Sequence, residues 1–336
     1  MTSLSLRATS FLIVLTTCQL VTAADFLVQV KTIPLKGVDG KLDHLAVDSK
    51  GERLFVANKP NNTLDIVDLK TGSLVKQIAD QGKVSGVAYA ADLDTIYVGN
   101  GVGVCNAFEG PEYRQLFSVK APDADNVHYH SGNKRVYVGC GELLKVIDAK
   151  SGESKAEIKL PGAVHGFKID KKAGLIYAVL TKASLVAVIN IEKHVVTETF
   201  PLTLSDAGSP IAQDSENQQL FVGCPKLKPM VVIFDSKTGK ELSSVTIPAG
   251  VDDVHFDSKR HRLYASCSDG ALIAIEKIND QYQIIGTIET PKNSRTCVWS
   301  KGKLYLAVPK TDGTDGPEIR IYEARPESVE QTSTTK

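Results

Sequence analysis

The sequence lacks the features that would point to a charged macromolecule as its partner. Its 39 lysine and arginine residues are balanced by 39 aspartate and glutamate residues, and no long block of one sign occurs. A neutral chain has no default electrostatic attraction to nucleic acid or to an anionic membrane. Beyond the first 25 residues, no segment is apolar for the roughly 18 residues that a membrane-spanning helix needs. We therefore expect neither nucleic-acid binding nor a membrane span.

Motifs for covalent cofactors and for structural zinc are also missing. No two of the 6 cysteines are spaced as C-x-x-C, and C-x-x-C-H does not occur. This argues against a covalently attached c-type haem and against a zinc knuckle. The chain has 1 tryptophan, Trp299, which together with the missing haem motif disfavours a redox subunit. The sequence thus defines no cofactor and leaves a divalent metal ion as a candidate.

The amino terminus has the layout of a secretory signal peptide. A single positive charge at Arg7 precedes an apolar run over 11–21, and small residues follow at Ala23 and Ala24. Polar residues interrupt this run, which makes it too short for a membrane anchor. We expect residues 1–24 to be a cleaved signal peptide and the mature protein to be periplasmic or secreted.

The mature chain would keep an odd number of cysteines, so at least one thiol is unpaired. The remaining cysteines are Cys105, Cys140, Cys224, Cys267 and Cys297. Since 42% of the chain is hydrophobic, a core can form without disulfides. We expect these thiols to be buried and free.

One strand pattern occurs seven times. Each copy begins with an aliphatic residue followed by an aromatic one, as in "LFVAN" at 54–58 and "IYVGN" at 96–100. The copies start at Leu54, Ile96, Val136, Ile176, Leu220, Leu263 and Leu304. Their spacing of 40 to 44 residues falls in the range that is typical of propellers and solenoids.

Each repeat contains four short strands. One strand precedes the repeated pattern, a third follows it, and a turn such as "DAKSGES" at 148–154 leads into a fourth. The related turns begin at Asp68 and Asp235, and the glycine four residues on can adopt positive φ at no steric cost. Four strands per repeat of about 40 residues predict an all-β fold, a seven-bladed β-propeller of four-stranded antiparallel blades.

The ends of the repeat array predict how the ring closes. The last repeat has three strands and finishes at 318–324, whereas 26–35 is a strand-like run without a blade of its own. We expect this amino-terminal strand to become the fourth strand of the last blade, because an open propeller would leave edges unpaired. The propeller would then span 25–324. The polar residues 325–336 are expected to be a disordered tail.

The repeats resemble the YVTN family of β-propellers, which includes the YncE-like periplasmic proteins. The resemblance rests on "LFVAN" and "IYVGN", on the Asp-x-x-Thr-Gly turn at 68–72, and on "VHGFKID" at 164–170. It covers 26–324 and implies a WD40/YVTN-like fold, which hosts binding modules, lactonases, quinoprotein subunits and haem-d1 enzymes. The second repeat lacks the turn, so the outer edge of its blade is the least defined part of the predicted fold.

The candidate site is one mouth of the central channel. The first strand of every blade should line this channel, so the two residues that open those strands should ring its mouth. The pairs are Asp43-His44, Ser85-Gly86, Asp125-Asn126, His165-Gly166, Ser209-Pro210, Asp252-Asp253 and Ser294-Arg295. Two residues further along each strand, the channel-facing position is expected to hold Ala46, Ala88, His128, Lys168, Ala212, His255 and Cys297.

We take the charged and hydrogen-bonding members as the candidate ligand-binding residues. They are Asp43, His44, Asp125, Asn126, His165, Asp252, Asp253 and Arg295, with His128, Lys168 and His255 lining the channel below. Carboxylates with histidine suit zinc-like ions, and carboxylates with asparagine suit calcium. The alternative is that these groups bond one another, loop backbone and channel water.

Two functions fit these residues. The first is an exported binding or scaffold module without catalytic activity, which is expected to be a monomer. Its partner would be a small polar or anionic ligand or an envelope protein. The second is a metal-dependent hydrolase of the lactonase type, with a channel metal that activates water. Its metal ligands would come from Asp43, Asp125, Asn126, His165 and Asp252.

Overall fold

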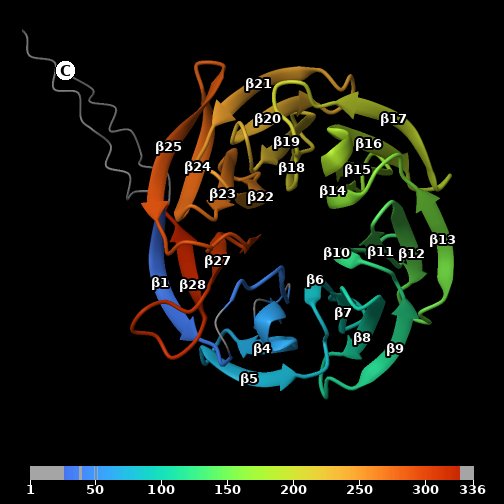
Figure 1. Cartoon of the computed structure of the whole chain (residues 1–336), viewed down its shortest axis with the longest axis vertical. Coiled ribbons are helices and arrows are strands. Elements are labelled where there is room, and N and C mark those ends of the chain that lie inside the picture. The colour runs from blue at the N-terminus through green and yellow to red at the C-terminus, as the bar shows by residue number, and fades with distance from the viewer. Residues whose placement is uncertain (1–25, 38–39, 49, 51, 326–336) are drawn as a thin grey trace, which may run out of the picture.

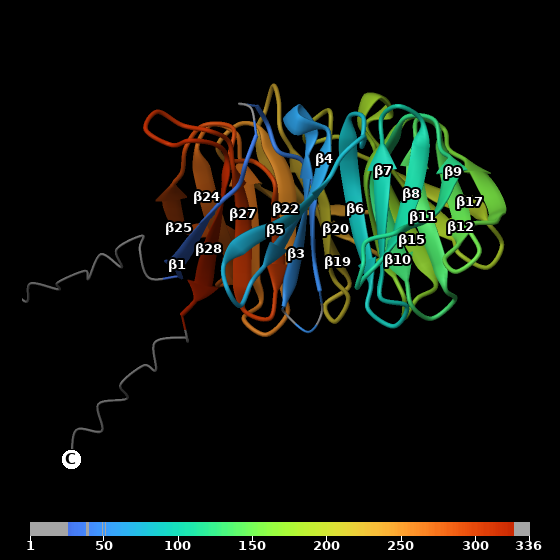
Figure 2. The same cartoon turned by 90° about the horizontal axis from the view of Figure 1, so that it is seen from below.

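A computed structural model describes residues 26–37, 40–48, 50 and 52–325. These residues form seven four-stranded antiparallel sheets around a central axis (Figure 1). Each sheet is a blade with its first strand innermost, and Figure 2 shows the ring from the side. The predicted seven-bladed β-propeller is therefore confirmed. The predicted signal peptide at 1–24 and most of the predicted tail at 325–336 lie outside the described residues.

The first four blades follow one another along the chain. Blade 1 contains β2 (Leu45–Val47), β3 (Arg53–Asn58), β4 (Thr63–Asp68) and β5 (Ser73–Ile78). Blade 2 contains β6 (Val84–Ala90), β7 (Thr95–Asn100), β8 (Val104–Glu109) and β9 (Gln115–Lys120). Blade 3 contains β10 (Ala124–His130), β11 (Arg135–Cys140), β12 (Leu143–Asp148) and β13 (Ser154–Lys159). Blade 4 contains β14 (Val164–Asp170), β15 (Leu175–Leu180), β16 (Leu185–Asn190) and β17 (Val195–Pro201).

The last three blades complete the ring. Blade 5 contains β18 (Ile211–Asp214), β19 (Gln219–Cys224), β20 (Met230–Asp235) and β21 (Glu241–Thr246). Blade 6 contains β22 (Val251–Asp257), β23 (Arg262–Cys267), β24 (Ala271–Ile278) and β25 (Gln281–Glu289). Blade 7 contains β26 (Cys297–Ser300), β27 (Lys303–Val308), β28 (Glu318–Ala324) and β1 (Leu27–Pro34). Two short 3-10 helices, η1 (Lys59–Asn61) and η2 (Thr181–Ala183), lie in the loops after β3 and β15. No helix in the described part of the chain is long and apolar enough to cross a membrane.

The ring closes through β1, as the sequence predicts. β1 pairs antiparallel with β28, with Leu27 opposite Ala324 and Pro34 opposite Glu318. Ile33 is fully buried in a cluster that joins blades 7 and 1. The first and last strands of the chain thus share one sheet, which ties the ends of the ring together.

The repeated turn joins the outer two strands of a blade. In blade 3, the Asp148 carboxylate accepts hydrogen bonds from the backbone N–H groups of Lys150 and Ser151, and Gly152 has a φ of 75°. Blade 2 lacks this turn but still forms its outer strand β9, which pairs with β8. The tight turn therefore helps to form the outer hairpin but is not required for it.

Hydrophobic side chains from neighbouring blades pack into shared clusters. In blades 3 and 4, for example, Tyr137 and Ile158 pack with Phe167 and Ile176. The five cysteines of the described chain are buried and unpaired. Burial raises the pKa of the Cys105 thiol to about 12, so it is an inert packing group. The prediction of buried free thiols is confirmed for these residues.

Candidate functional site

Three inner strands, β6, β10 and β14, have the same β-bulge at the end that faces the channel mouth. In β10, Ala124 pairs with Cys140 and Val127 with Val138, so two residues of β10 oppose one residue of β11. The same irregularity occurs in β6 and β14. Because a bulge breaks the alternation of side chains, both residues of a pair can face the mouth. The pairs at 165–166, 209–210 and 252–253 each contribute both members to the lining of the channel.

Two of these pairs need glycine because neighbouring blades approach closely there. A Cβ atom on Gly86 would lie 1.8 Å from the backbone oxygen of Asp125 in the next blade. A Cβ atom on Gly166 would lie 2.5 Å from the backbone oxygen of Ser209. Any side chain at these positions would push the inner strands apart. The glycines therefore set the narrow spacing of the ring at the mouth.

In blade 7, the register between the first two strands differs by one residue from the register that the alignment of the repeats predicts. Tyr305 pairs with Val298, whereas the matching Phe55 of blade 1 pairs with Ala46. The prediction that aligned Cys297 with Ala46 was therefore wrong. The reason is the turn between β26 and β27, which is two residues shorter than the turn between β6 and β7. By this register the mouth pair of blade 7 is Arg295 and Thr296, and Cys297 takes the place of an apolar residue.

Asp43 is the most buried carboxylate at the mouth. It accepts hydrogen bonds from the Lys59 ammonium at 2.7 Å and from the Ser85 hydroxyl at 2.9 Å. Ser85 also lies 2.6 Å from a carboxylate oxygen of Asp125. Burial would raise the pKa of Asp43, but His44, Lys59 and Ser85 together hold it below its usual value. Asp43 is therefore ionised and engaged.

His44 lies between two carboxylates. Its Nδ1 is 3.6 Å from Asp253 and its Nε2 is 3.9 Å from Asp43. Burial alone would lower the pKa of His44, but Asp253 and then Asp43 and Asp125 raise it to about 10. The side chain is therefore an imidazolium at neutral pH. Asp253 also accepts the backbone N–H of Cys297 at 2.9 Å.

Asp252 and Arg295 form the third charged pair, with the Arg295 Nε 3.1 Å from the carboxylate. Burial raises the pKa of Asp252 in spite of the opposing charge of Arg295. Asp43, Asp125, Asp252 and Asp253 thus each have an ion-pair or hydrogen-bond partner among the described residues. The mouth is acidic in composition, but most of its charge is compensated within the protein.

His165 and Asn126 carry hydrogen-bonding groups across the mouth. The Asn126 amide donates to the backbone oxygen of His165 at 2.5 Å. The His165 Nδ1 lies 2.9 Å from the Ser209 hydroxyl. These contacts link blades 3, 4 and 5 and leave His165 exposed at the opening.

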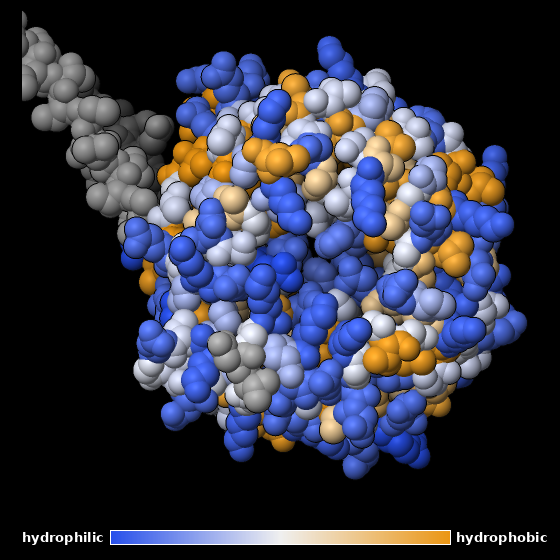
Figure 3. All heavy atoms as spheres, in the orientation of Figure 1, coloured by the Kyte–Doolittle hydropathy of each residue, from blue (hydrophilic) through white to orange (hydrophobic). Residues whose placement is uncertain are grey.

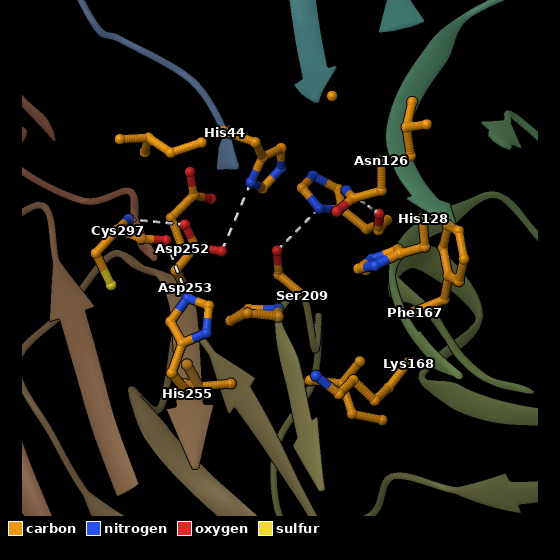
Figure 4. Close-up of a pocket in the computed structure, with 18 of the residues that line it drawn as sticks. His44, Asn126, His128, Phe167, Lys168, Ser209, Asp252, Asp253, His255 and Cys297 are labelled. Atoms are coloured by element: carbon orange, nitrogen blue, oxygen red, sulfur yellow. Dashed lines mark hydrogen bonds and ion pairs between the residues drawn. The ribbon is translucent and has the colours of Figure 1, made fainter. Parts of the chain in front are cut away.

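Three basic side chains lie deeper in the channel at equivalent strand positions. His255 contacts the Cys297 carbonyl oxygen through Nε2 at 2.9 Å. The His128 ring packs edge-on against Phe167 at 4.5 Å. Among the described residues, none forms a hydrogen bond or an ion pair with the Lys168 ammonium. Figure 4 shows His255 on one side of this pocket and His128 with Lys168 on the other.

Burial controls the protonation of these three groups. It lowers the pKa of His128 to about 3, with the positive charge of Lys168 as the next cause. It also lowers the pKa of His255, which Asp253 only partly opposes. The pKa of Lys168 is lowered by burial and by Lys171. Both imidazoles are therefore neutral at pH 7, and the lowered pKa of Lys168 reflects an amine that has no compensating anion among the described residues.

These layers enclose a pocket of about 100 Å³ at the channel mouth. All seven blades contribute lining residues. Along the inner strands, an apolar residue follows each mouth pair, and we call these residues the apolar level although most of each side chain packs in the clusters between blades. The apolar level consists of Leu45, Val87, Val127, Phe167, Ile211, Val254 and Cys297. Figure 3 shows hydrophilic residues around the central hollow of this face. A water molecule occupies about 30 Å³ in the liquid, so the pocket suits a few waters or one small ligand.

Asp253, His255 and Cys297 form the one metal-like group that occurs among the described residues, with possible donor atoms within 4.8 Å of one another. The donors fit a metal poorly. Burial raises the pKa of the Cys297 thiol well above its ordinary value, so a metal ion would have to displace its proton, because the thiolate is the form that binds metal. His255 and Asp253 are also engaged with the Cys297 backbone.

The structure brings together most of the residues that the sequence nominated, and it adds Lys59, Ser85, Ser209 and Phe167. Lys59 follows β3 in a loop, where a solvated lysine is the common case. Its ammonium instead reaches Asp43. The sequence does show Lys59 directly after the second strand of its repeat, and Ser85 and Ser209 in two of the mouth pairs. Their contacts depend on loop paths that the repeats do not define.

The fold and the site define a seven-bladed β-propeller with a polar channel pocket. No protein-family model matches the sequence, and no curated protein matches it. Among solved structures, the chain is similar to hydrazine synthase from Kuenenia stuttgartiensis. The similarity has a TM-score of 0.73 at 15% identity and covers 81% of this chain and 94% of that one. At this identity the similarity shows the fold alone.

Proposed function

We propose that the protein is an exported, YVTN-like binding propeller without catalytic activity, and that it holds a small polar ligand in its channel mouth. The export part of the proposal rests on the signal-like residues 1–24. The observation that carries the binding part is the pocket at the mouth. Closed β structures commonly bind ligands at such mouths.

The state of the lining side chains supports a binding role. The mouth carboxylates are largely satisfied by protein groups, whereas Lys168 has no hydrogen-bond or ion-pair partner among the described residues. A buried polar group without a partner costs free energy. A bound ligand would supply that partner, and the apolar level would contact its carbon atoms.

Removal of the Asn126 and His165 side chains at the mouth tests this proposal. We expect Asn126→Ala with His165→Ala to weaken binding about thirtyfold, because a hydrogen bond contributes about 1 kcal/mol, two would be lost, and each 1.4 kcal/mol is a factor of ten. The measurement is a thermal-shift screen of small polar compounds followed by calorimetry on each hit. The double variant should still melt cooperatively, because Asn126 and His165 lie outside the core.

Asn217→Ala with Ser258→Ala is the matched control, since both residues are exposed in turns on the opposite face. This control should bind as the unaltered protein does. Equal affinity of the mouth variant and the control for every hit would contradict a site at the mouth. A screen without any hit would contradict the binding function itself.

A metal-dependent hydrolase of the lactonase type is the second candidate, and the group Asp253, His255 and Cys297 favours it. The protonated thiol and the engaged carboxylate and imidazole count against it. We therefore expect elemental analysis of the purified mature protein to find no stoichiometric metal. We also expect a chelator to leave its melting temperature unchanged. A metal at a hundred times its dissociation constant would stabilise the fold by about 2.7 kcal/mol. Stoichiometric metal with a chelator-sensitive melt would favour the hydrolase and call for a lactone and ester screen.

A further inference from the structure

We propose that the floor of the channel pocket is an anion site, in which Lys168, His128 and His255 hold the carboxylate of a small monocarboxylic acid. This inference rests on the proposed binding function and specifies the chemical class of the ligand. It follows from three features of the pocket: a cation without a counterion, two neutral imidazoles beside it, and an apolar level between this floor and the polar mouth.

The cation comes first. The Lys168 ammonium lies in the pocket wall and has no hydrogen-bond or ion-pair partner among the described residues. The two carboxylates that line the pocket are committed elsewhere, since Asp253 faces His44 and the Cys297 N–H and Asp252 faces Arg295. An unpaired ammonium that is partly withdrawn from water, as Lys168 is, is costly unless an anion compensates it. The expected ligand is therefore an anion.

The imidazoles add hydrogen bonds to this charge. His255 Nε2 lies 2.9 Å from the Cys297 carbonyl, which can only accept, so Nε2 carries the hydrogen. Its Nδ1 is then an acceptor in the neutral ring and a donor once protonated. No described residue forms a hydrogen bond with the His128 ring, so its ring N–H is available to a ligand oxygen. A carboxylate at the floor could thus receive two or three charge-assisted hydrogen bonds.

The apolar level selects a carboxylate over an inorganic anion. All seven blades contribute to this level, from Leu45 in blade 1 to Cys297 in blade 7. Phosphate or sulfate at the floor would place polar oxygens against these side chains without partners. A short carbon chain matches them, and a hydroxyl on that chain could reach Asn126 or His165 at the mouth. The pocket of about 100 Å³ limits the ligand to a few heavy atoms.

Binding of an anion should be linked to proton uptake. A negative charge at the floor favours the protonated forms of Lys168, His128 and His255, whose pKa values are lowered in the empty pocket. The other charged groups that influence these pKa values are His44 and Asp253 in the pocket wall and the exposed Lys171, whose ammonium contacts Ser131 outside the pocket. The affinity should therefore fall as the pH rises, and binding at neutral pH should take up protons from the buffer.

Calorimetry on the purified mature protein tests the inference. The probes are acetate, propionate and lactate, with propionamide as the neutral isostere and inorganic phosphate as the polar anion. We expect a carboxylate to bind at least tenfold more tightly than propionamide or phosphate, and at least tenfold more tightly at pH 6 than at pH 9. Titrations in buffers of different ionisation enthalpy should reveal the proton uptake.

Two lysine variants separate the site from general surface charge. Lys168→Met should weaken carboxylate binding at least tenfold without lowering the melting temperature, because it removes an uncompensated buried charge. Lys171→Met removes an exposed lysine nearby and should leave the affinity within twofold. Lys168→Arg should retain part of the affinity, since it keeps the positive charge.

The outcomes also separate this inference from the proposed function. Neutral or cationic hits with no carboxylate among them would overturn the anion site and leave the binding propeller in place. Tighter binding of phosphate than of any carboxylate would overturn the choice of ligand class. Carboxylate binding that is unaffected by Lys168→Met would overturn the assignment to the floor. A complete lack of binding would overturn both proposals.

Discussion

A chain that begins after Pro34 is expected to lose the cooperative thermal transition of the intact protein. This truncation removes β1 and leaves β28 as an open edge of blade 7. It also removes Phe26, Leu27 and Ile33, which are buried in clusters shared with blades 6, 7 and 1. Differential scanning calorimetry on the truncated chain measures the effect. A chain that begins at Asp25 keeps β1 and should melt as the mature protein does.

Point substitutions on the same strand test closure without truncation. Ile33 is fully buried opposite Ile319, whereas Val30 is 49% exposed. Ile33→Asp should destabilise the propeller by about 4 kcal/mol or more, because it removes a core side chain and buries a carboxylate. Val30→Asp should change the stability by about 0.5 kcal/mol at most. Denaturant unfolding of the two variants gives the comparison.

Closure by β1 would be refuted by an unchanged cooperative melt in the truncated chain. Equal stabilities of Ile33→Asp and Val30→Asp would refute it as well, because the two residues share a strand and differ chiefly in burial. A loss confined to Ile33→Asp would indicate that the contact with Ile319, rather than an added charge on the strand, closes the ring.

The fold could be predicted because each of the seven repeats contains the local sequence signals for its own strands. Each blade carries its own alternation and turn residues, so one ambiguous segment is resolved by the six others. Closure of the ring could be predicted for a similar reason. The last repeat supplies three strands and the amino terminus supplies one, and pairing them is the simplest way to complete a four-stranded blade. A missing turn in blade 2 did not prevent β9 from forming, because packing on the neighbouring strand β8 outweighs turn chemistry.

The site could be predicted in its composition and only partly in its geometry. Stacking the repeats placed His128, Lys168 and His255 at one depth, because the strand period is fixed. The compensation of Asp43 by Lys59 was missed, because it depends on the path of a loop. The register of blade 7 was missed for a related reason, since a turn shorter by two residues shifts the strand without changing its apolar pattern.

The charges at the mouth imply that the propeller loses stability in alkaline solution. His44 has a pKa of about 10 in the folded protein, against an ordinary value of 6.5. A group whose pKa is raised by folding contributes its full stabilisation below the unfolded value and loses it as the pH rises through the folded one. The ion pairs of His44 should thus stabilise the fold up to about neutral pH and fade towards pH 10 and above.

The expected loss of stability follows from the pKa shift of His44 and from the distances to its carboxylate partners. At 1.36 kcal/mol per pKa unit, the shift sets an upper limit of about 5 kcal/mol. The contacts of 3.6 Å and 3.9 Å are longer than hydrogen bonds, so we expect about 3 kcal/mol, the lower end of what a broken buried ion pair costs. His44→Asn should therefore be about 3 kcal/mol less stable than the unaltered protein at pH 6.

The difference between the two proteins, rather than either curve alone, isolates His44. Other titratable groups contribute to both proteins and cancel in the comparison. The gap measured by denaturant unfolding should be widest at pH 6 and narrow steadily towards pH 10. His261→Asn, at an exposed position, should show no such gap. A constant gap from pH 6 to pH 10 would mean that His44 acts through its shape and not its charge. Asp43 and Asp253 would then have to be balanced by Lys59 and the Cys297 N–H alone.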